Sequence, residues 1–251
     1  MKGTVLLFSV FIQFAALAQQ RADTVIQGIP VLFDFHVAIY PESWAADPIN
    51  GDGGSLEPSE RQRSRKILRS ALLKYPSALL SRNLQAVFVL KYMNFYKVGY
   101  GGTNSNDRVF ITNNGEALGY SDRYIEQTFH HEFSSILYRN HPLLLDDEKW
   151  QASNPENFSY TDPENGVGAI RKNESSQDID TGFCRRGFLT QYAMSGLEND
   201  INTIAQNLFS PAEDFWETVD NYPLIARKAR LLISFYNKLD PIFTENYFRR
   251  Q

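Results

Sequence analysis

The sequence predicts an α+β fold, with a small mixed sheet ahead of a helical C-terminal half. Residues 30–40 combine alternation with β-branched and aromatic side chains, and residues 86–90 and 109–112 are short apolar runs. From residue 121 onward, apolar residues recur mainly at helical spacing. About 230 residues beyond the N-terminal stretch can bury one sizeable core, so residues 19–251 are predicted to form a single domain.

The predicted elements follow a simple order, in which two helices separate the first strand from the next two. The strands are predicted at 30–40, 86–90 and 109–112, and the helices at 59–73, 76–84, 121–137, 201–209 and 223–239. A loop rich in Gly, Asp and Pro is expected at 41–58. Between about 142 and 187 the chain is polar with scattered aromatic residues, which is typical of a long functional loop.

The N-terminus is predicted to be a secretory signal peptide at residues 1–18. It has a basic Lys2, an apolar stretch at 5–14, and the small residues Ala16 and Ala18 where signal peptidase cuts. No later stretch approaches the roughly 20 apolar residues of a transmembrane helix. The protein is therefore expected to be secreted or periplasmic, with no transmembrane segment.

The sequence contains one cysteine, Cys184, so there is no lipobox cysteine near the predicted cleavage site. One cysteine cannot form an internal disulfide, and Cys184 is expected to be buried in the core. The formal net charge of −4 gives no electrostatic reason to expect a nucleic acid as partner.

The helix predicted at 121–137 has a favourable N-terminal cap and one apolar face. Ser121 is a favourable N-cap and Asp122 lies in the first turn, where it complements the helix dipole. At 100° per residue, a polar strip runs beside the apolar stripe of this helix, and His130 projects from another side. The strip consists of Thr128, His131, Glu132 and Ser135.

His131 and Glu132 match the first half of the HExxH motif of zinc peptidases. In that motif, two histidines four residues apart share one helical face and hold Zn²⁺, while the glutamate after the first histidine activates water. The position of the second histidine is Ser135 in this sequence. The sequence therefore predicts a metal-binding helix with one ligand missing.

Several stretches together resemble a family of exported zinc-binding metallopeptidases of Bacteroidetes, often encoded near nutrient-import outer-membrane genes. The stretches are Tyr75-Pro76 with Leu79-Leu80, Val87 to Leu90, Tyr100-Gly101-Gly102-Thr103, His130-His131-Glu132-Phe133, Gly187-Phe188, Tyr192-Ala193-Met194-Ser195 and residues 228–236. They cover most of the chain beyond residue 18. The resemblance implies a zincin-like domain, a zinc cofactor, a peptide or protein substrate and an outer-membrane import partner.

The resemblance also implies where the remaining site residues lie. In this family the third zinc ligand is a glutamate that opens a later helix, after a Tyr-Ala-x-Ser stretch. The matching position here is Asn199, and Glu198 stands one residue earlier. We therefore expect His131 and Glu198 as the metal ligands, with Asp200 and His141 as other side chains that could swing in.

For the chemistry, the resemblance implies that Glu132 takes the proton of a zinc-bound water, whose pKa the metal lowers to roughly 7. Tyr192, which precedes the ligand helix, is expected to donate a hydrogen bond to the oxyanion.

Two functions stay open at this point. The first is zinc-dependent peptide hydrolysis with a rearranged set of ligands. The second is a catalytically inactive relative that keeps the cleft as a binding surface for a peptide, a glycan or an import partner in envelope nutrient uptake; a peptide can be held by strand addition without chemistry. Ser135 and Asn199 weigh against the first, because a hydroxyl and an amide are poor Zn²⁺ ligands beside imidazole and carboxylate.

Overall fold

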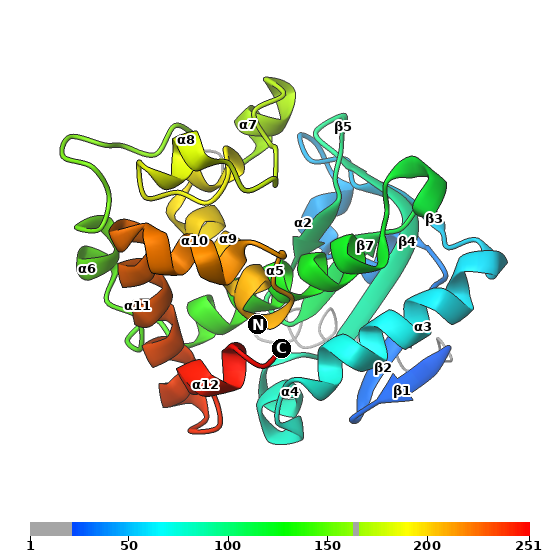
Figure 1. Ribbon diagram of the computed structural model, residues 1–251. Coiled ribbons are helices and arrows are strands. Elements are labelled where there is room, and N and C mark those ends of the chain that lie inside the picture. Colours follow the sequence, from blue (N-terminus) through cyan, green and yellow to red (C-terminus); the bar gives the residue numbers. More distant parts are fainter. Residues whose placement is uncertain (1–21, 163–165) are drawn as a thin grey trace, which may run out of the picture.

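The computed structural model describes residues 22–162 and 166–251, so the predicted signal peptide at 1–18 lies outside the described residues. Figure 1 shows a sheet on one side of the molecule, the helices of the C-terminal half on the other, and helix α5 between them. The predicted α+β class, with its small mixed sheet, motif helix and helical C-terminal half, is confirmed.

The sheet is mixed, and its main strand order is β1-β2-β4-β7-β6. Strands β2, β4 and β7 are parallel, whereas β1 and β6 pair antiparallel with their neighbours. Strands β3 and β5 pair antiparallel with the far end of β4. The strands are β1 (Thr24–Ile26), β2 (Ile29–Leu32), β3 (Asp52–Ser55), β4 (Ala86–Phe95), β5 (Val98–Gly99), β6 (Gly102–Asn104) and β7 (Arg108–Thr112).

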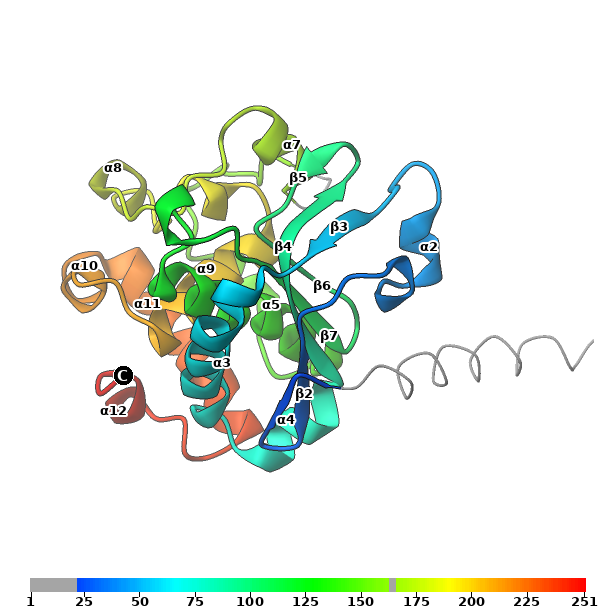
Figure 2. The ribbon, with the colours of Figure 1, turned by 90° about the vertical axis from the view of Figure 1, so that its right-hand side faces the viewer.

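The first half of β4, Ala86 to Leu90, is buried on both faces, which explains why these five residues form an unbroken apolar run. Val87 and Val89 belong to the main core, where the sheet meets helices α3 and α5. Phe88 and Leu90 point to the opposite face and form a smaller core with aromatic side chains such as Tyr40. Figure 2 shows α3 on one side of strands β2 and β4 and α2 on the other.

The helices account for most of the rest of the described chain. The longer ones are α3 (Pro58–Leu73), α5 (Asp122–Asn140), α9 (Leu197–Phe209) and α11 (Pro223–Leu239). The shorter ones are α2 (Glu42–Ala45), α4 (Ser77–Asn83), α6 (Asp147–Gln151), α7 (Val167–Arg171), α8 (Thr181–Cys184), α10 (Phe215–Asn221) and α12 (Glu245–Phe248). Short 3-10 turns lie at Val37–Ile39, Glu116–Leu118 and Tyr192–Met194.

The predicted strand at 30–40 is too long, because β2 ends at Leu32. Beyond that point the chain bonds to the segment around β3: Leu56 N donates to Phe33 O at 2.8 Å, and Phe35 N donates to Ser55 Oγ at 2.9 Å. The chain then turns into the 3-10 helix at Val37–Ile39.

The segment Asp52–Ser55 was predicted to be loop, but it is strand β3. Its glycines let two aromatic rings approach the backbone, since a Cβ at Gly53 would lie 2.8 Å from Phe35 Cδ2 and one at Gly54 would lie 2.5 Å from Tyr92 Cε1. Glycine therefore serves close packing in this strand rather than a turn.

Two other sequence predictions have clear outcomes. Cys184 is buried, as predicted. The polar region at about 142–187 contains the short helices α6, α7 and α8, and Asp146 and Asp180 cap the first and last of these. Within the described part of the chain, we find no helix that combines the length and the apolar character needed to span a membrane.

Candidate ligand-binding cleft

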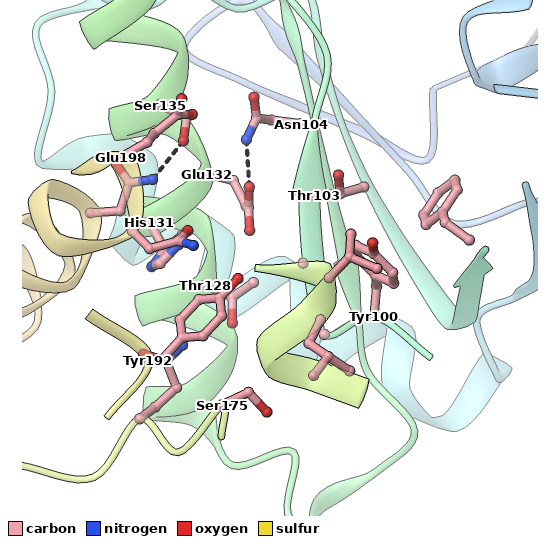
Figure 3. A pocket seen from close by; sticks show the side chains of 18 of the residues that line it. Tyr100, Thr103, Asn104, Thr128, His131, Glu132, Ser135, Ser175, Tyr192 and Glu198 are labelled. Carbon is pink, nitrogen blue, oxygen red and sulfur yellow. Dashed lines mark hydrogen bonds between the residues drawn. The ribbon is translucent and has the colours of Figure 1, made fainter. Parts of the chain in front are cut away.

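A cleft of about 600 Å³ lies where α5, α9, β6 and the segment around Tyr192 come together. The site residues predicted from the sequence, His131, Glu132, Tyr192 and Glu198, all line it. Figure 3 shows Glu132 facing Asn104 across the cleft, with His131 and Tyr192 near one another. The prediction that His131 and Glu132 share one cleft is therefore confirmed.

Helices α5 and α9 are joined beside this cleft by a series of four hydrogen-bonded pairs, which we call the inter-helix ladder. The two helices are antiparallel here: successive pairs lie four residues later along α5 and four residues earlier along α9, starting from Ser210. The pairs are Gln127 Nε2 with Ser210 O at 2.7 Å, His131 Nδ1 with Gln206 Oε1 at 2.8 Å, Asn202 Nδ2 with Ser135 Oγ at 2.6 Å, and Arg139 Nη1 with Glu198 Oε1 at 2.6 Å. His131 and Ser135 occupy the two ligand positions of the HExxH motif on α5, and both belong to this ladder.

Glu132 is a buried carboxyl that faces the edge strand. Asn104 Nδ2 donates to its Oε2 at 2.5 Å, and a Cβ at Gly102 would lie 2.6 Å from its Oε1. Burial raises the pKa of Glu132 to about 7, and the nearby charge of Glu198 adds to the rise, whereas Asn104 and Arg139 oppose it. Glu132 therefore changes protonation near neutral pH.

His131 is held in one tautomer. Its Nδ1 bonds to the carbonyl oxygen of Gln206, an atom that can only accept, so Nδ1 carries the proton. The amide group of Gln206 points instead toward Gln177 Oε1, at 3.4 Å, which fixes this orientation. Burial lowers the pKa of His131, against the effect of Gln206 and Glu198, and the ring is neutral at pH 7.

Asn199, the position matched to the third ligand, is buried next to His131. Its Nδ2 donates to Ser195 Oγ at 2.8 Å, and its side chain interacts with the imidazole of His131 and the hydroxyl of Tyr192. Glu198 lies at the far end of the ladder, where it is paired with Arg139. The sequence therefore placed position 199 correctly beside His131, but an amide stands there.

Tyr192 belongs to the short 3-10 turn before α9, and its ring stacks on His131 with centroids 6.1 Å apart. Gly166 packs against it so closely that a Cβ there would lie 2.3 Å from the Tyr192 hydroxyl. Burial raises the pKa of Tyr192, and the negative charge of Glu132 raises it further. Its hydroxyl is therefore a neutral hydrogen-bonding group at all ordinary pH values.

The other candidate ligands lie elsewhere. His130 is buried with its Nδ1 2.9 Å from the Tyr75 hydroxyl, and burial lowers its pKa to about 4. His141 bonds to Asn83 Oδ1 at 3.2 Å, away from the cleft. Asp200 is buried against Lys228 at 2.7 Å. None of the three lines the cleft.

The donor set does not fit a zinc ion. Structural and catalytic zinc sites take three or four His, Cys, Asp or Glu ligands around one point. Over residues 22–162 and 166–251, no three such side chains are grouped so that they could hold a metal. Ser135 and Asn199, which stand at the two other ligand positions, are already bonded to Asn202 and Ser195.

Sequence reasoning missed the polar residues that bind these side chains. Asn104 lies on β6, Arg139 on α5, and Asn202 and Gln206 on α9. A signal was present in the polar residues spaced by four on both helices, at 127, 131, 135 and 139 and at 198, 202 and 206. That spacing marks one face of each helix, but it does not reveal that the two faces meet.

Comparison with known proteins gives few matches. No protein-family model matches the chain, and no curated protein matches it. Among solved structures, the chain is similar to a protein from Bacteroides caccae ATCC 43185 whose name reads "putative zinc-binding metallo-peptidase", with 17% sequence identity, coverage of 74% of each chain and a TM-score of 0.48. A similarity of this level does not assign a function to this chain.

Proposed function

We propose that this protein binds an extended peptide segment in the cleft without zinc-dependent hydrolysis. The observation that carries the proposal is the inter-helix ladder, which uses the side chains of His131 and Ser135 to join α5 to α9. Side-chain amides already occupy the hydrogen-bonding groups at both metal-ligand positions of α5. The cleft is therefore better suited to binding a peptide than to holding a catalytic metal.

The peptide is inferred from strand β6, which is last in the strand order and lines the cleft. Thr112 N donates to Gly101 O, and Ser105 N donates to Arg108 O, so residues 101, 103 and 105 are the ones that bond to β7. The backbone groups of Gly102 and Asn104 point the other way, toward the open edge. An edge of this kind accepts an extended peptide by strand addition.

Two measurements on the chain from Gln19 onward test the proposal. After exposure to Zn²⁺ and dialysis, mass spectrometry is expected to find far less than one zinc per chain, in the wild type and in His131→Ala alike. Peptides labelled with fluorescein at the C-terminus are expected to bind saturably and to survive intact, and N-methylation of alternate backbone amides should abolish binding. Failure of every peptide to bind would refute the proposal.

Zinc-dependent peptide hydrolysis is the second candidate, and one observation favours it. Histidines that bind metals usually donate the other ring N–H to a fixed acceptor, as His131 does to Gln206. Near-stoichiometric zinc that disappears in His131→Ala, together with peptide cleavage that disappears in Glu132→Gln, would establish this candidate instead.

The proposed place of action is outside the cytoplasm, in the periplasm or beyond the cell, because residues 1–18 have the composition of a signal peptide. An import protein of the outer membrane is the proposed partner, on the basis of the family resemblance. Fractionation of cells that express the full chain tests the location, and N-terminal sequencing should find Gln19 as the first residue.

A further inference from the structure

Asn202 on α9 has a buried polar atom that no group in the described part of the chain satisfies. Its side chain is 1% exposed and lines the cleft. The Nδ2 atom donates to Ser135 Oγ at 2.6 Å, but Oδ1 has no hydrogen-bond partner among the residues that the structure describes. Burying an acceptor without a donor is unfavourable, so this atom points to a group that a ligand brings.

The cleft lining offers carboxyl groups and no unpaired cationic side chain among its described residues. Two carboxyl groups line it, those of Glu132 and Glu198, and Arg139 is the one Lys or Arg side chain among the described lining residues. Arg139 is already bonded to Glu198 and to Asn104 Oδ1. The Glu132 carboxyl therefore offers acceptor oxygens in the same lining, and its hydrogen-bond donor is the neutral Asn104.

We propose that the cleft takes a primary ammonium group of its ligand beside Asn202 Oδ1. An ammonium group has three N–H donors and no acceptor, so it supplies the missing donor. The group belongs either to a lysine side chain or to the free N-terminus of a peptide. This inference rests on the proposed peptide-binding function, because it names the part of the peptide that the cleft recognises.

A small probe tests the ammonium site without a peptide. Binding of n-butylammonium, of n-butanol and of n-butyrate is measured by NMR titration of the chain from Gln19 onward. Because a hydrogen bond to a charged group is stronger than one between neutral groups, n-butylammonium is expected to bind at least about tenfold more tightly. Equal binding of the two probes, or tighter binding of n-butyrate, would overturn the proposal.

Variants at the same position separate the acceptor from the fold. Asn202→Leu removes Oδ1 and should abolish the preference for n-butylammonium, whereas Asn202→Asp keeps an acceptor and should preserve or increase it. Circular dichroism confirms that each variant is folded. An Asn202→Leu protein that is folded and keeps the preference contradicts the proposal.

Peptides then identify the source of the ammonium group. An acetylated alanine peptide with one central lysine, its norleucine counterpart, and a free-amine alanine peptide are compared by calorimetry. Tight binding of the first alone assigns a lysine side chain, and tight binding of the third alone assigns an N-terminus. If all three bind equally, peptide binding stands and the ammonium inference fails. If no peptide binds but n-butylammonium does, the proposed function fails and the ammonium site stands.

Discussion

A buried ion pair behind the cleft gives a sharp test of how the helical half is held together. Lys228 on α11 is 0% exposed, Asp200 on α9 is 1% exposed, and their charged atoms are 2.7 Å apart. Lys228 also donates to Gly187 O at 2.7 Å, and Asp200 Oδ2 accepts from Trp150 Nε1 and the Tyr160 hydroxyl, both at 2.9 Å. We consider the substitution Lys228→Met, which keeps the apolar stem and removes the charge.

The expected loss in the free energy of unfolding comes from the Asp200 carboxylate, which stays buried after Lys228 is replaced. Without Lys228, the carboxylate of Asp200 is buried with two neutral donors, and removal of one partner from a buried pair costs about 3–5 kcal/mol. Domains of this size have a free energy of unfolding of only about 5–15 kcal/mol, so the loss is a large fraction of it. Replacing both charges, as in Asp200→Asn with Lys228→Met, should recover most of the loss, since the amide oxygen still accepts from Trp150 and Tyr160.

The loss should also depend on pH. Burial already raises the pKa of Asp200 and Lys228 opposes the rise, so the pKa climbs further in Lys228→Met. An acid whose pKa is raised by folding gives stability that is present at low pH and is lost as the pH rises through the folded-state value. The deficit of Lys228→Met is therefore expected to be larger at pH 8 than at pH 5.

Urea unfolding at pH 5 and pH 8, followed by tryptophan fluorescence, measures both effects in the wild type and the two variants. A loss below about 1 kcal/mol at pH 8 would place the pair among weak surface contacts and refute the reasoning. A deficit that is the same at both pH values would refute the account of Asp200 protonation.

Three further predictions concern the cleft. Because burial raises the pKa of Glu132 to about 7 from an ordinary 4.5, its contribution to stability is fully present below pH 4.5 and is lost as the pH rises through 7. Urea unfolding should show a fall of about 1–3 kcal/mol between pH 5 and 8 that is absent in Glu132→Gln; equal slopes contradict this. Gly102→Ala puts a Cβ 2.4 Å from Thr128 Cγ2, so it should cost about 1–3 kcal/mol and weaken peptide binding. Gly99→Ala is its control, with the nearest atom at 3.8 Å, and an equal effect of both refutes the packing argument. Ser135→Ala should cost about 1–3 kcal/mol by leaving the amide of Asn202 unpaired, and adding Asn202→Leu should restore most of it; a double-mutant cycle without coupling contradicts the ladder.

The sequence predicted the parts of the site that depend on one helix. The N-cap at Ser121 is confirmed, since its Oγ accepts from Tyr124 N at 3.2 Å. The rule of 100° per residue correctly placed His131 and Glu132 in one cleft and His130 outside it. Local rules of this kind need no knowledge of the rest of the fold.

The parts that the sequence did not predict depend on how distant segments meet. The pairing of His131 with Gln206 joins residues 75 positions apart, and it requires the relative register of two helices. Strand β3 escaped prediction because its glycines read as a turn, and the rings of Phe35 and Tyr92 that need them come from other segments. A pattern within one segment carries no information on such contacts.

The ladder holds α5 against α9 through His131 and Ser135, the two α5 positions of the predicted metal site. A bound metal would join α5 to the segment that opens α9 through side chains of both, and its removal would leave a buried histidine and carboxylate without partners. Hydrogen bonds fill the same mechanical role here: Gln206 holds His131, Asn202 holds Ser135, and Arg139 holds Glu198. Each pair consists either of neutral side chains or of an ion pair. The two helices therefore stay joined without a metal ion between them. The same arrangement leaves Asn202 Oδ1 without a partner among the described residues, and this is the atom to which the proposed ammonium group would donate.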